Sequence, residues 1–466
     1  MSDYIEVFGL IGGTRQDNSP MQMDDAANVG HLLARDATFG TFGVFSSDFW
    51  KGKLVDGIEE LAQVDQIQEM SSPGEFSFRL RVQSSLFDPL RGGIQHLIGI
   101  LAGDLGILQV RGLQLRTVKI RSISFPSSWE KSIREAYRRD SAHDITEVRT
   151  AFKLEDDEPL LAFSIKPRIG LTSAGLEEIT LGVLAAGFHI VELDTRDLDL
   201  SSDTLRKLVE LSKKAAQVGK DKRVTRFSVN VSVPSCAAIE ICGLLKNDIP
   251  APFVVKVDGG LDGISTCQAV RRAYPRNKHG DSPYITTYPL LRRVIQERIA
   301  DDTFLKALIW SGSDIIYPGN APNLGGYRQL DHAGVGSLAT SVDRYWQFLS
   351  SGFPMPTVAG GIYPGQLQAY YELLGPKVAY FIGGGLALHK DGPLKGAQLC
   401  ARIIKEARHL RSKAKKGEFA IELSDKLKEE AEGAIQIPPG ADEATFRYFP
   451  PSELLKAPGL QPWFKR

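Results

Sequence analysis

From about residue 158 onward, short apolar runs rich in β-branched and aromatic residues alternate with longer segments whose apolar positions recur every three or four residues. The first pattern is typical of buried strands and the second of amphipathic helices. The predicted strands are 160–167, 188–194, 226–234, 252–260, 284–289, 314–320, 355–361 and 378–385. The predicted helices that follow them are 172–187, 201–217, 235–248, 263–275, 290–302, 341–351, 364–375 and 392–410.

Eight consecutive strand–helix pairs favour one fold class. A doubly wound sheet usually closes with five or six strands, whereas a (β/α)8 barrel requires eight. We therefore predict an α/β protein with a C-terminal (β/α)8 barrel at 151–412. Catalytic residues of such barrels lie at the carboxyl ends of the strands.

The remaining segments have different patterns. Residues 1–150 combine strand-like stretches at 39–50 and 77–83 with helix-like stretches at 24–35 and 131–140, which predicts a small α+β domain ahead of the barrel. Residues 413–466 carry one charged helix and then a proline-rich end, so we predict a C-terminal extension that follows the surface.

Composition excludes several classes of function. The 56 Lys+Arg balance 56 Asp+Glu, so no overall field attracts nucleic acid or an anionic membrane. The sequence has no apolar run of membrane-spanning length, and its first residues do not read as a signal peptide. The four cysteines lack metal-ligand spacing. These observations favour a cytoplasmic protein that acts on a small molecule.

Charged side chains end three of the predicted strands. Because alternate strand residues share a face, we expect three groups to face one way: Ser164 with Lys166 and Arg168, Glu192 with Asp194, and Lys256 with Asp258. Opposed charges at a barrel mouth can prepare a general base or hold a divalent cation. A ring of stabilising ion pairs is the alternative.

Glycine clusters end the last two predicted barrel strands, at Gly360-Gly361 and Gly383-Gly384-Gly385. The loops after strands seven and eight are the recurrent phosphate site of this fold, where backbone N–H groups approach an anion. Tight turns alone are the other interpretation.

Several segments, in order over most of residues 25–411, resemble the large-subunit family of ribulose bisphosphate carboxylase (RuBisCO). They are AGDLGILQVRGLQLRTVKI, IKPRIGLTSAGLEEITLGVLAAGFHIVELD, TVAGGIYPG and FIGGGLALH. The resemblance implies an α+β domain before the barrel and a homodimer whose active site is shared between subunits. It also implies that Lys166 takes part in proton transfer and that the glycine clusters hold the substrate phosphate.

The sequence departs from this family at the end of the second barrel strand. The carboxylases have there a lysine that is carbamylated and binds Mg²⁺ with an aspartate and a glutamate. This chain has Glu192, Asp194 and Thr195 at those positions, so no carbamylated lysine is expected. Glu192 and Asp194 could form a reduced Mg²⁺ site; alternatively they pair with Lys166 or Lys256 and act without metal.

Further departures point away from CO2 fixation. Tyr288 and Pro289 replace the family's histidine and arginine after the fifth strand, and Ile315 and Tyr317 replace its histidine pair. The loop at 319–330 contains no lysine. By the same alignment, Asp104 replaces an asparagine that binds substrate and metal, and Tyr288 remains a substrate-binding candidate.

The resemblance therefore favours the RuBisCO-like proteins (form IV): a non-carboxylating enzyme that transfers a proton next to a carbonyl of a phosphorylated sugar or sugar acid. Isomerisation, enolisation and decarboxylation all remain open. A catalytically decayed sugar-phosphate-binding regulator or scaffold is the main alternative. An unrelated aldolase barrel with Lys166 or Lys256 as a Schiff base is the third.

Overall fold

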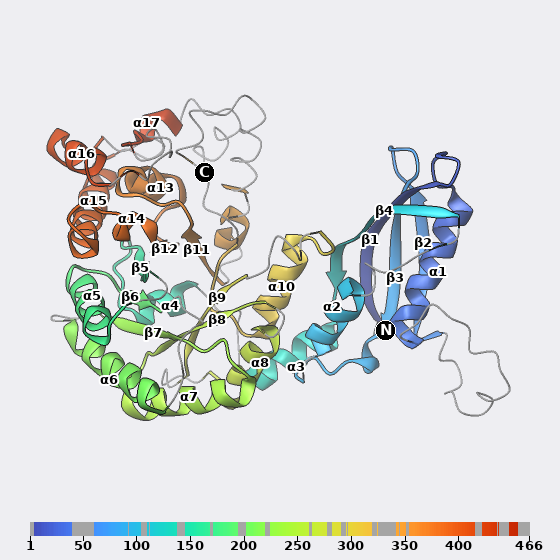
Figure 1. Cartoon of the computed structure of the whole chain (residues 1–466), viewed down its shortest axis with the longest axis horizontal. Helices are drawn as coiled ribbons and strands as arrows, with labels where there is room; N and C mark the ends of the chain where they lie inside the picture. Colours follow the sequence, from blue (N-terminus) through green and yellow to red (C-terminus); the bar gives the residue numbers. More distant parts are fainter. Residues whose placement is uncertain are drawn as a thin grey trace. The chain divides into compact units, whose positions relative to one another are not determined.

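The computed structural model describes residues 4–39, 60–91, 93–103, 110, 112–137, 145–167, 171–193, 202–219, 224–260, 263–276, 282–289, 295, 297–318, 324, 342–343, 345–350, 354–414, 422–435, 437 and 447–454. These residues form two compact units (Figure 1). Unit one comprises residues 1–140 with 259–272 and 289–312, and unit two comprises the rest. The predicted boundaries at 150 and 412 stay predictions.

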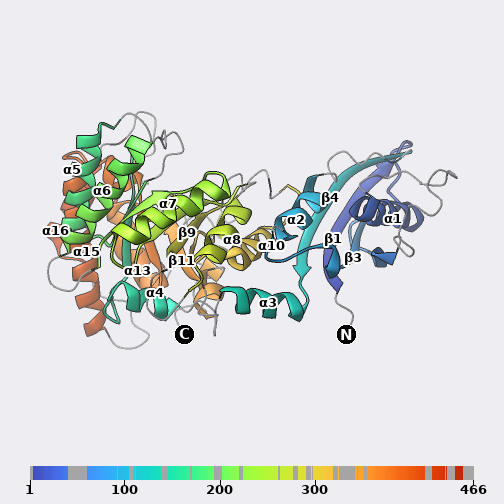
Figure 2. The ribbon, with the colours of Figure 1, turned by 90° about the horizontal axis from the view of Figure 1, so that it is seen from below.

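Unit one contains a four-stranded antiparallel sheet in the order β2-β3-β1-β4 (Figure 2). Alternate residues of its central strand β1 are buried, as the period of a half-buried strand requires. The bounds are β1 Tyr4–Arg15, α1 Met23–Phe39, β2 Ala62–Glu69, β3 Glu75–Gln83, α2 Gly93–Gly103, β4 Leu113–Ser124 and α3 Ser127–Tyr137. The predicted α+β domain is confirmed; of the strand predicted at 39–50, Phe39 ends α1 and residues 40–50 lie outside the described residues.

Unit two contains a closed barrel of eight parallel strands in the order β10-β11-β12-β5-β6-β7-β8-β9. All eight predicted strands are present, which confirms the predicted barrel. Their bounds are β5 Leu160–Ser164, β6 Ile190–Glu192, β7 Arg226–Asn230, β8 Val254–Asp258, β9 Tyr284–Tyr288, β10 Ile315–Ile316, β11 Met355–Ala359 and β12 Ala379–Ile382.

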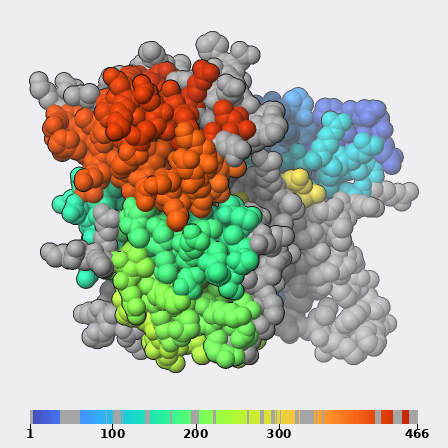
Figure 3. Space-filling view, turned by 60° about the vertical axis from the view of Figure 1, so that its left-hand side comes forward, coloured from blue at the N-terminus to red at the C-terminus, as the bar shows by residue number. Residues whose placement is uncertain are grey.

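The helices follow the predicted ones with one exception. Their bounds are α4 Ile145–Ala151, α5 Ser173–Ala185, α6 Ser202–Val218, α7 Ser235–Asp248, α8 Gly263–Ala273, α10 Asp301–Ser311, α13 Leu367–Leu374, α14 Gly384–Ala387, α15 Pro393–Lys413, α16 Asp425–Glu432 and α17 Pro451–Leu454. Residues 345–350 are also helical. Figure 3 shows α15 (orange) lying next to α5 (teal). Within the described residues, no helix is long and apolar enough to cross a bilayer.

The exception is the helix predicted at 290–302, which was wrong in its second half. Ile295 is helical, residues 297–300 are not, and α10 begins at Asp301. Immediately before it, the backbone pairs with β4: Ile120 N–H donates to Arg298 O at 2.7 Å, and Ala300 N–H donates to Ile120 O at 2.8 Å. This extended pairing satisfies backbone groups that the predicted helix would have used, so tertiary context overrides the amphipathic pattern.

Buried apolar residues pack at the amino-terminal ends of the barrel strands. Ile145, Val148 and Phe152, from α4 and the residue after it, are buried and pack in one cluster with Leu160, Ile190 and other inward apolar residues. The amino-terminal end is therefore closed by packed side chains, which leaves the carboxyl ends as the place for a site.

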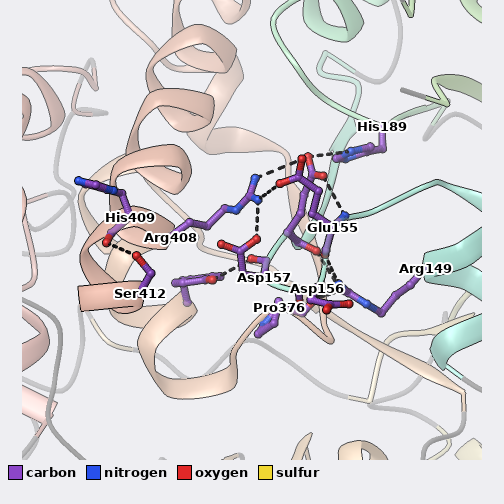
Figure 4. Close-up of polar contacts among 11 residues, drawn as sticks. Arg149, Glu155, Asp156, Asp157, His189, Pro376, Arg408, His409 and Ser412 are labelled. Atoms are coloured by element: carbon purple, nitrogen blue, oxygen red, sulfur yellow. Dashed lines mark hydrogen bonds and ion pairs between the residues drawn. The ribbon is translucent and has the colours of Figure 1, made fainter. Parts of the chain in front are cut away.

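A polar cluster also holds the amino-terminal end of the barrel together (Figure 4). The buried Arg149 guanidinium donates to the carbonyls of Glu158 and Pro376, at 2.9 and 2.6 Å. Arg408 of α15 pairs with Glu155 and Asp157 at 2.5 Å each. A cleft of about 1380 Å³ between α5 and α15 borders this cluster. It lies at the opposite end of the strands from the predicted site.

Glu158 occupies the centre of this cluster. Its carboxylate lies 3.5 Å from Nε2 of the buried His189, whose Nδ1 accepts a hydrogen bond from Leu161 N–H. Burial by itself would raise the pKa of Glu158, yet the hydrogen bond from His189 and the positive charge of the nearby Arg408 lower it from 4.5 to about 2. Ionised Glu158 therefore stabilises the fold above about pH 4.5, and this contribution is lost as the pH falls toward 2.

We expect Glu158→Gln to lower the free energy of unfolding by roughly 2–3 kcal/mol at pH 7, because the lowered pKa corresponds to a stabilised carboxylate. The difference from wild type should shrink as the pH drops below 4.5. Urea unfolding followed by circular dichroism over a pH series measures this. The matched control is Glu155→Gln, because Glu155 pairs with the same Arg408 but its side chain is 74% exposed. A pH-independent difference for Glu158→Gln would contradict the prediction.

Candidate active site at the carboxyl ends of the barrel strands

Polar side chains line the barrel interior at the ends of β5 to β9. Ser164 pairs in register with Glu192, and Lys256 pairs with Thr286. Residues paired in parallel strands share a face, and Glu192 reaches Thr286 although β6 and β9 are not neighbours. The contact must cross the interior, so this face points into the barrel.

Glu192 is the centre of this layer. Its side chain is 0% exposed. Oε1 accepts a hydrogen bond from Ser164 Oγ at 3.1 Å and lies 3.3 Å from Lys256 Nζ. Oε2 accepts from Thr286 Oγ1 at 3.0 Å. Both carboxylate oxygens therefore have partners, as a buried charge requires.

Lys256 lies between two carboxylates. It is 3% exposed, and its Nζ is also 3.7 Å from Asp258 Oδ1. Asn230 donates from Nδ2 to Asp258 Oδ2 at 3.0 Å, and Asp258 N–H donates to Ser232 Oγ at 2.7 Å. The predicted shared face of Lys256 and Asp258 agrees with this geometry, and β7 holds Asp258 in position.

Aromatic rings occupy the barrel beside this polar layer. Tyr288 is 40% exposed, and its ring lies 5.7 Å from Lys256 Nζ. The rings of Tyr288 and Tyr317 meet edge to face at 5.1 Å, and Tyr317 contacts Phe381 at 5.4 Å. Ile315 and Tyr317 belong to the buried apolar core. The end of β10 therefore supplies an isoleucine and a tyrosine to the core.

The two glycine segments lie side by side at the ends of β11 and β12. A Cβ on Gly385 would lie 2.2 Å from Ile362 O, so glycine allows the two loops to touch. Gly360 and Gly361 have φ of +84° and +72°, a backbone that favours glycine. Gly384 has neither constraint: its φ is not positive, and a Cβ there would meet nothing within 4 Å.

Lys166 follows β5 and lies next to this glycine region. A Cβ on Gly383 would be 3.6 Å from Lys166 Cε, and β5 is hydrogen-bonded to β12. The half-buried Lys166 is thus at the same barrel end as Glu192 and Lys256, on the strand next to β12 and two strands from β11. Arg168, Asp194 and Asp104 lie outside the described residues.

Sequence reasoning missed some members of the polar layer, namely Thr286, Asn230 and Ser232. A signal was available, because Ser228, Asn230 and Ser232 alternate with valines along this strand. Polar residues at every second position of a buried strand predict an inward polar face.

The described donors do not fit a Mg²⁺ site of the kind that the family resemblance implies. Mg²⁺ needs oxygen ligands in near-octahedral geometry. Glu192 offers one carboxylate whose two oxygens are engaged, with an ammonium group 3.3 Å away. The part of the chain that the structure describes contains no group of three or more His, Cys, Asp or Glu residues arranged for a metal.

A (β/α)8 barrel behind an antiparallel α+β domain, with charged residues and glycine loops at the strand ends, defines an enzyme-like architecture. Comparisons with known proteins agree. A ribulose bisphosphate carboxylase from Methanosarcina mazei is 22% identical over 351 residues, which cover 71% of this chain and 77% of that protein. No family model matches the chain.

Solved structures share the fold. A dimeric archaeal RuBisCO from Hyperthermus butylicus superimposes with a TM-score of 0.64 at 16% identity, over 87% of this chain and 91% of that chain. A RuBisCO-like protein from Burkholderia fungorum gives a TM-score of 0.61 at 16% identity, over 89% and 95%. The resemblance to the RuBisCO large-subunit family, RuBisCO-like proteins included, is confirmed.

Proposed function

We propose that this chain is a non-carboxylating RuBisCO-like enzyme that moves a proton next to a carbonyl of a phosphorylated sugar or sugar acid. The observation that carries the proposal is the position of Lys166. Lys166 follows β5, and its side chain lies beside Gly383 at the barrel end where Glu192 and Lys256 also lie. A proton-transfer group next to an anion-accepting backbone suits the isomerisation, enolisation or decarboxylation of a sugar phosphate.

In this proposal Lys166 exchanges the proton, and the loops after β11 and β12 bind the phosphate. The open space at Gly384 supports this role, since no contact within the described chain requires glycine there. A side chain would restrict the approach of an anion to the backbone N–H groups. Tyr288 is exposed at the strand end and would contact the substrate.

Carboxylation is not part of the proposal. Ile315 and Tyr317 are buried apolar-core residues and have no imidazole to offer a substrate. Glu192 has no amine to carry a carbamate. Its carboxylate contacts Ser164, Thr286 and Lys256. Proton exchange at a carbon next to a carbonyl needs neither group.

The test is a screen of phosphorylated aldoses, ketoses and 3-keto sugar acids for hydrogen exchange with D2O, followed by NMR. We expect exchange, with or without net conversion, for at least one phosphorylated compound and none for its dephosphorylated form. Binding of a sugar phosphate with no exchange for any compound would overturn the enzyme proposal in favour of a regulator. Trapping of a substrate adduct by borohydride would instead indicate a Schiff-base aldolase.

We also expect a homodimer with a shared active site, because the resemblance implies that the N-terminal domain of one subunit completes the barrel site of the other. Such dimers have twofold symmetry. Sedimentation velocity over a concentration series measures the state, and turnover measured at the same concentrations tests whether activity follows the dimer. A monomer with full activity would contradict this prediction.

A further inference from the structure

The Lys256–Glu192 contact occupies the place where the family resemblance locates a metal centre. We infer that the Lys256 ammonium replaces the divalent cation as the counter-ion of Glu192, so that Glu192 is not a metal ligand in this chain. The inference concerns the same site as the proposed function and rests on it only for the choice of that site.

Both oxygens of the Glu192 carboxylate already have partners. Oε1 of Glu192 has Ser164 Oγ at 3.1 Å and Lys256 Nζ at 3.3 Å, and Oε2 has Thr286 Oγ1 at 3.0 Å. Oε1 already has two donors, so a divalent ion on that oxygen would have to displace Ser164 Oγ or Lys256 Nζ. In a fully buried site the displaced hydroxyl or ammonium would then lose its hydrogen bond without gaining water.

The positive charge of Lys256 also opposes a divalent cation at Glu192. Lys256 and Glu192 are 3% and 0% exposed, so solvent screens their interaction poorly. The ammonium lies 3.3 Å from Glu192 and 3.7 Å from Asp258, so Glu192 is the nearer of its two carboxylates. A divalent cation brought next to Glu192 would face a fixed positive charge at close range, and that repulsion is strongest where the surroundings are least polar.

Neighbouring residues of the barrel hold Lys256 in this place. Asp258 provides a second carboxylate at 3.7 Å from Nζ. Asn230 and Ser232 in turn hold Asp258 through its side chain and its backbone N–H. An ammonium held from two sides stays close to Glu192, as an electrostatic counter-ion must. Lys256 is therefore a positioning residue, which holds the Glu192 carboxylate in place at the carboxyl ends of the strands.

The experiment is Mn²⁺ binding to the full-length protein, followed by electron paramagnetic resonance, for wild type and Glu192→Gln. Because this measurement needs no substrate, its result does not depend on whether the proposed reaction is correct. We expect Mn²⁺ affinity, whether absent or contributed by other residues, to be unchanged by Glu192→Gln. A loss of roughly tenfold or more in affinity would make Glu192 a ligand and overturn the inference.

A double variant, Glu192→Gln with Lys256→Met, guards against misfolding caused by an unpaired Glu192, because it removes both charges of that pair while Asp258 keeps its hydrogen bond from Asn230. Its Mn²⁺ affinity should equal that of wild type. Lys256→Met alone should raise Mn²⁺ affinity, because it leaves a buried carboxylate without its counter-ion. Circular dichroism of each variant verifies the fold.

Discussion

Lys166→Met is expected to reduce turnover by roughly 100- to 10,000-fold, the usual cost of removing one general acid–base group. Lys166 follows the barrel strand β5, and its carbon chain passes Gly383 at the strand ends, whereas the barrel core is built from other residues. Methionine keeps much of this apolar stem and removes only the amine. The fold should therefore be unchanged while proton exchange is lost.

The measurement is hydrogen exchange of the substrate found in the D2O screen, compared with thermal unfolding of the same variant. Lys395→Met on the exposed face of α15 is the matched control, because it makes the same substitution away from the strand ends. Lys166→Cys alkylated with bromoethylamine restores an amine of similar length and should recover part of the activity. Full turnover in folded Lys166→Met would remove Lys166 from the mechanism.

The fold could be predicted from the sequence because each barrel strand is a short buried run that ends at a polar or glycine residue. Val254–Asp258 illustrates this, since its apolar residues are buried and its end carries Asp258. The helix before Asp301 was misplaced because its residues pair with β4, a contact between distant parts of the chain. A periodic pattern records local burial and contains no information about such a partner.

The sequence predicted which side chains of the candidate site face the barrel interior, but not which of them contact each other across it. The pattern placed Glu192 and Lys256 facing the same interior, but it could not decide whether Glu192 pairs with Lys166 or with Lys256. The pairing depends on which residues of nonadjacent strands lie at the same height along the barrel axis. The stagger of neighbouring strands sets that height. The structure brings Lys256 within 3.3 Å of Glu192. The role of either residue in catalysis stays a prediction.

The buried pair also has a consequence for stability. Lys256→Met is expected to lower the free energy of unfolding by roughly 3–5 kcal/mol, the cost of removing one partner from a buried ion pair. The ammonium that neutralises Glu192 would be lost, and only Ser164 and Thr286 of the described contacts would remain on its carboxylate. Urea unfolding at pH 7 measures the change, and Lys395→Met provides the control for an exposed lysine, expected within about 0.5 kcal/mol of wild type.

A double-mutant cycle separates the pair from its surroundings. Glu192→Gln with Lys256→Met should recover part of the lost stability, because Glu192 is no longer an unpaired buried charge, whereas Asp258 keeps its hydrogen bond from Asn230 but still loses the ammonium. The two single variants should therefore sum to a larger loss than the double variant shows. If Lys256→Met instead costs less than about 1 kcal/mol, the value of a solvent-exposed pair, then water reaches Glu192 and the carboxylate is open to other cations. That result would also weaken the assignment of Lys256 as its permanent counter-ion.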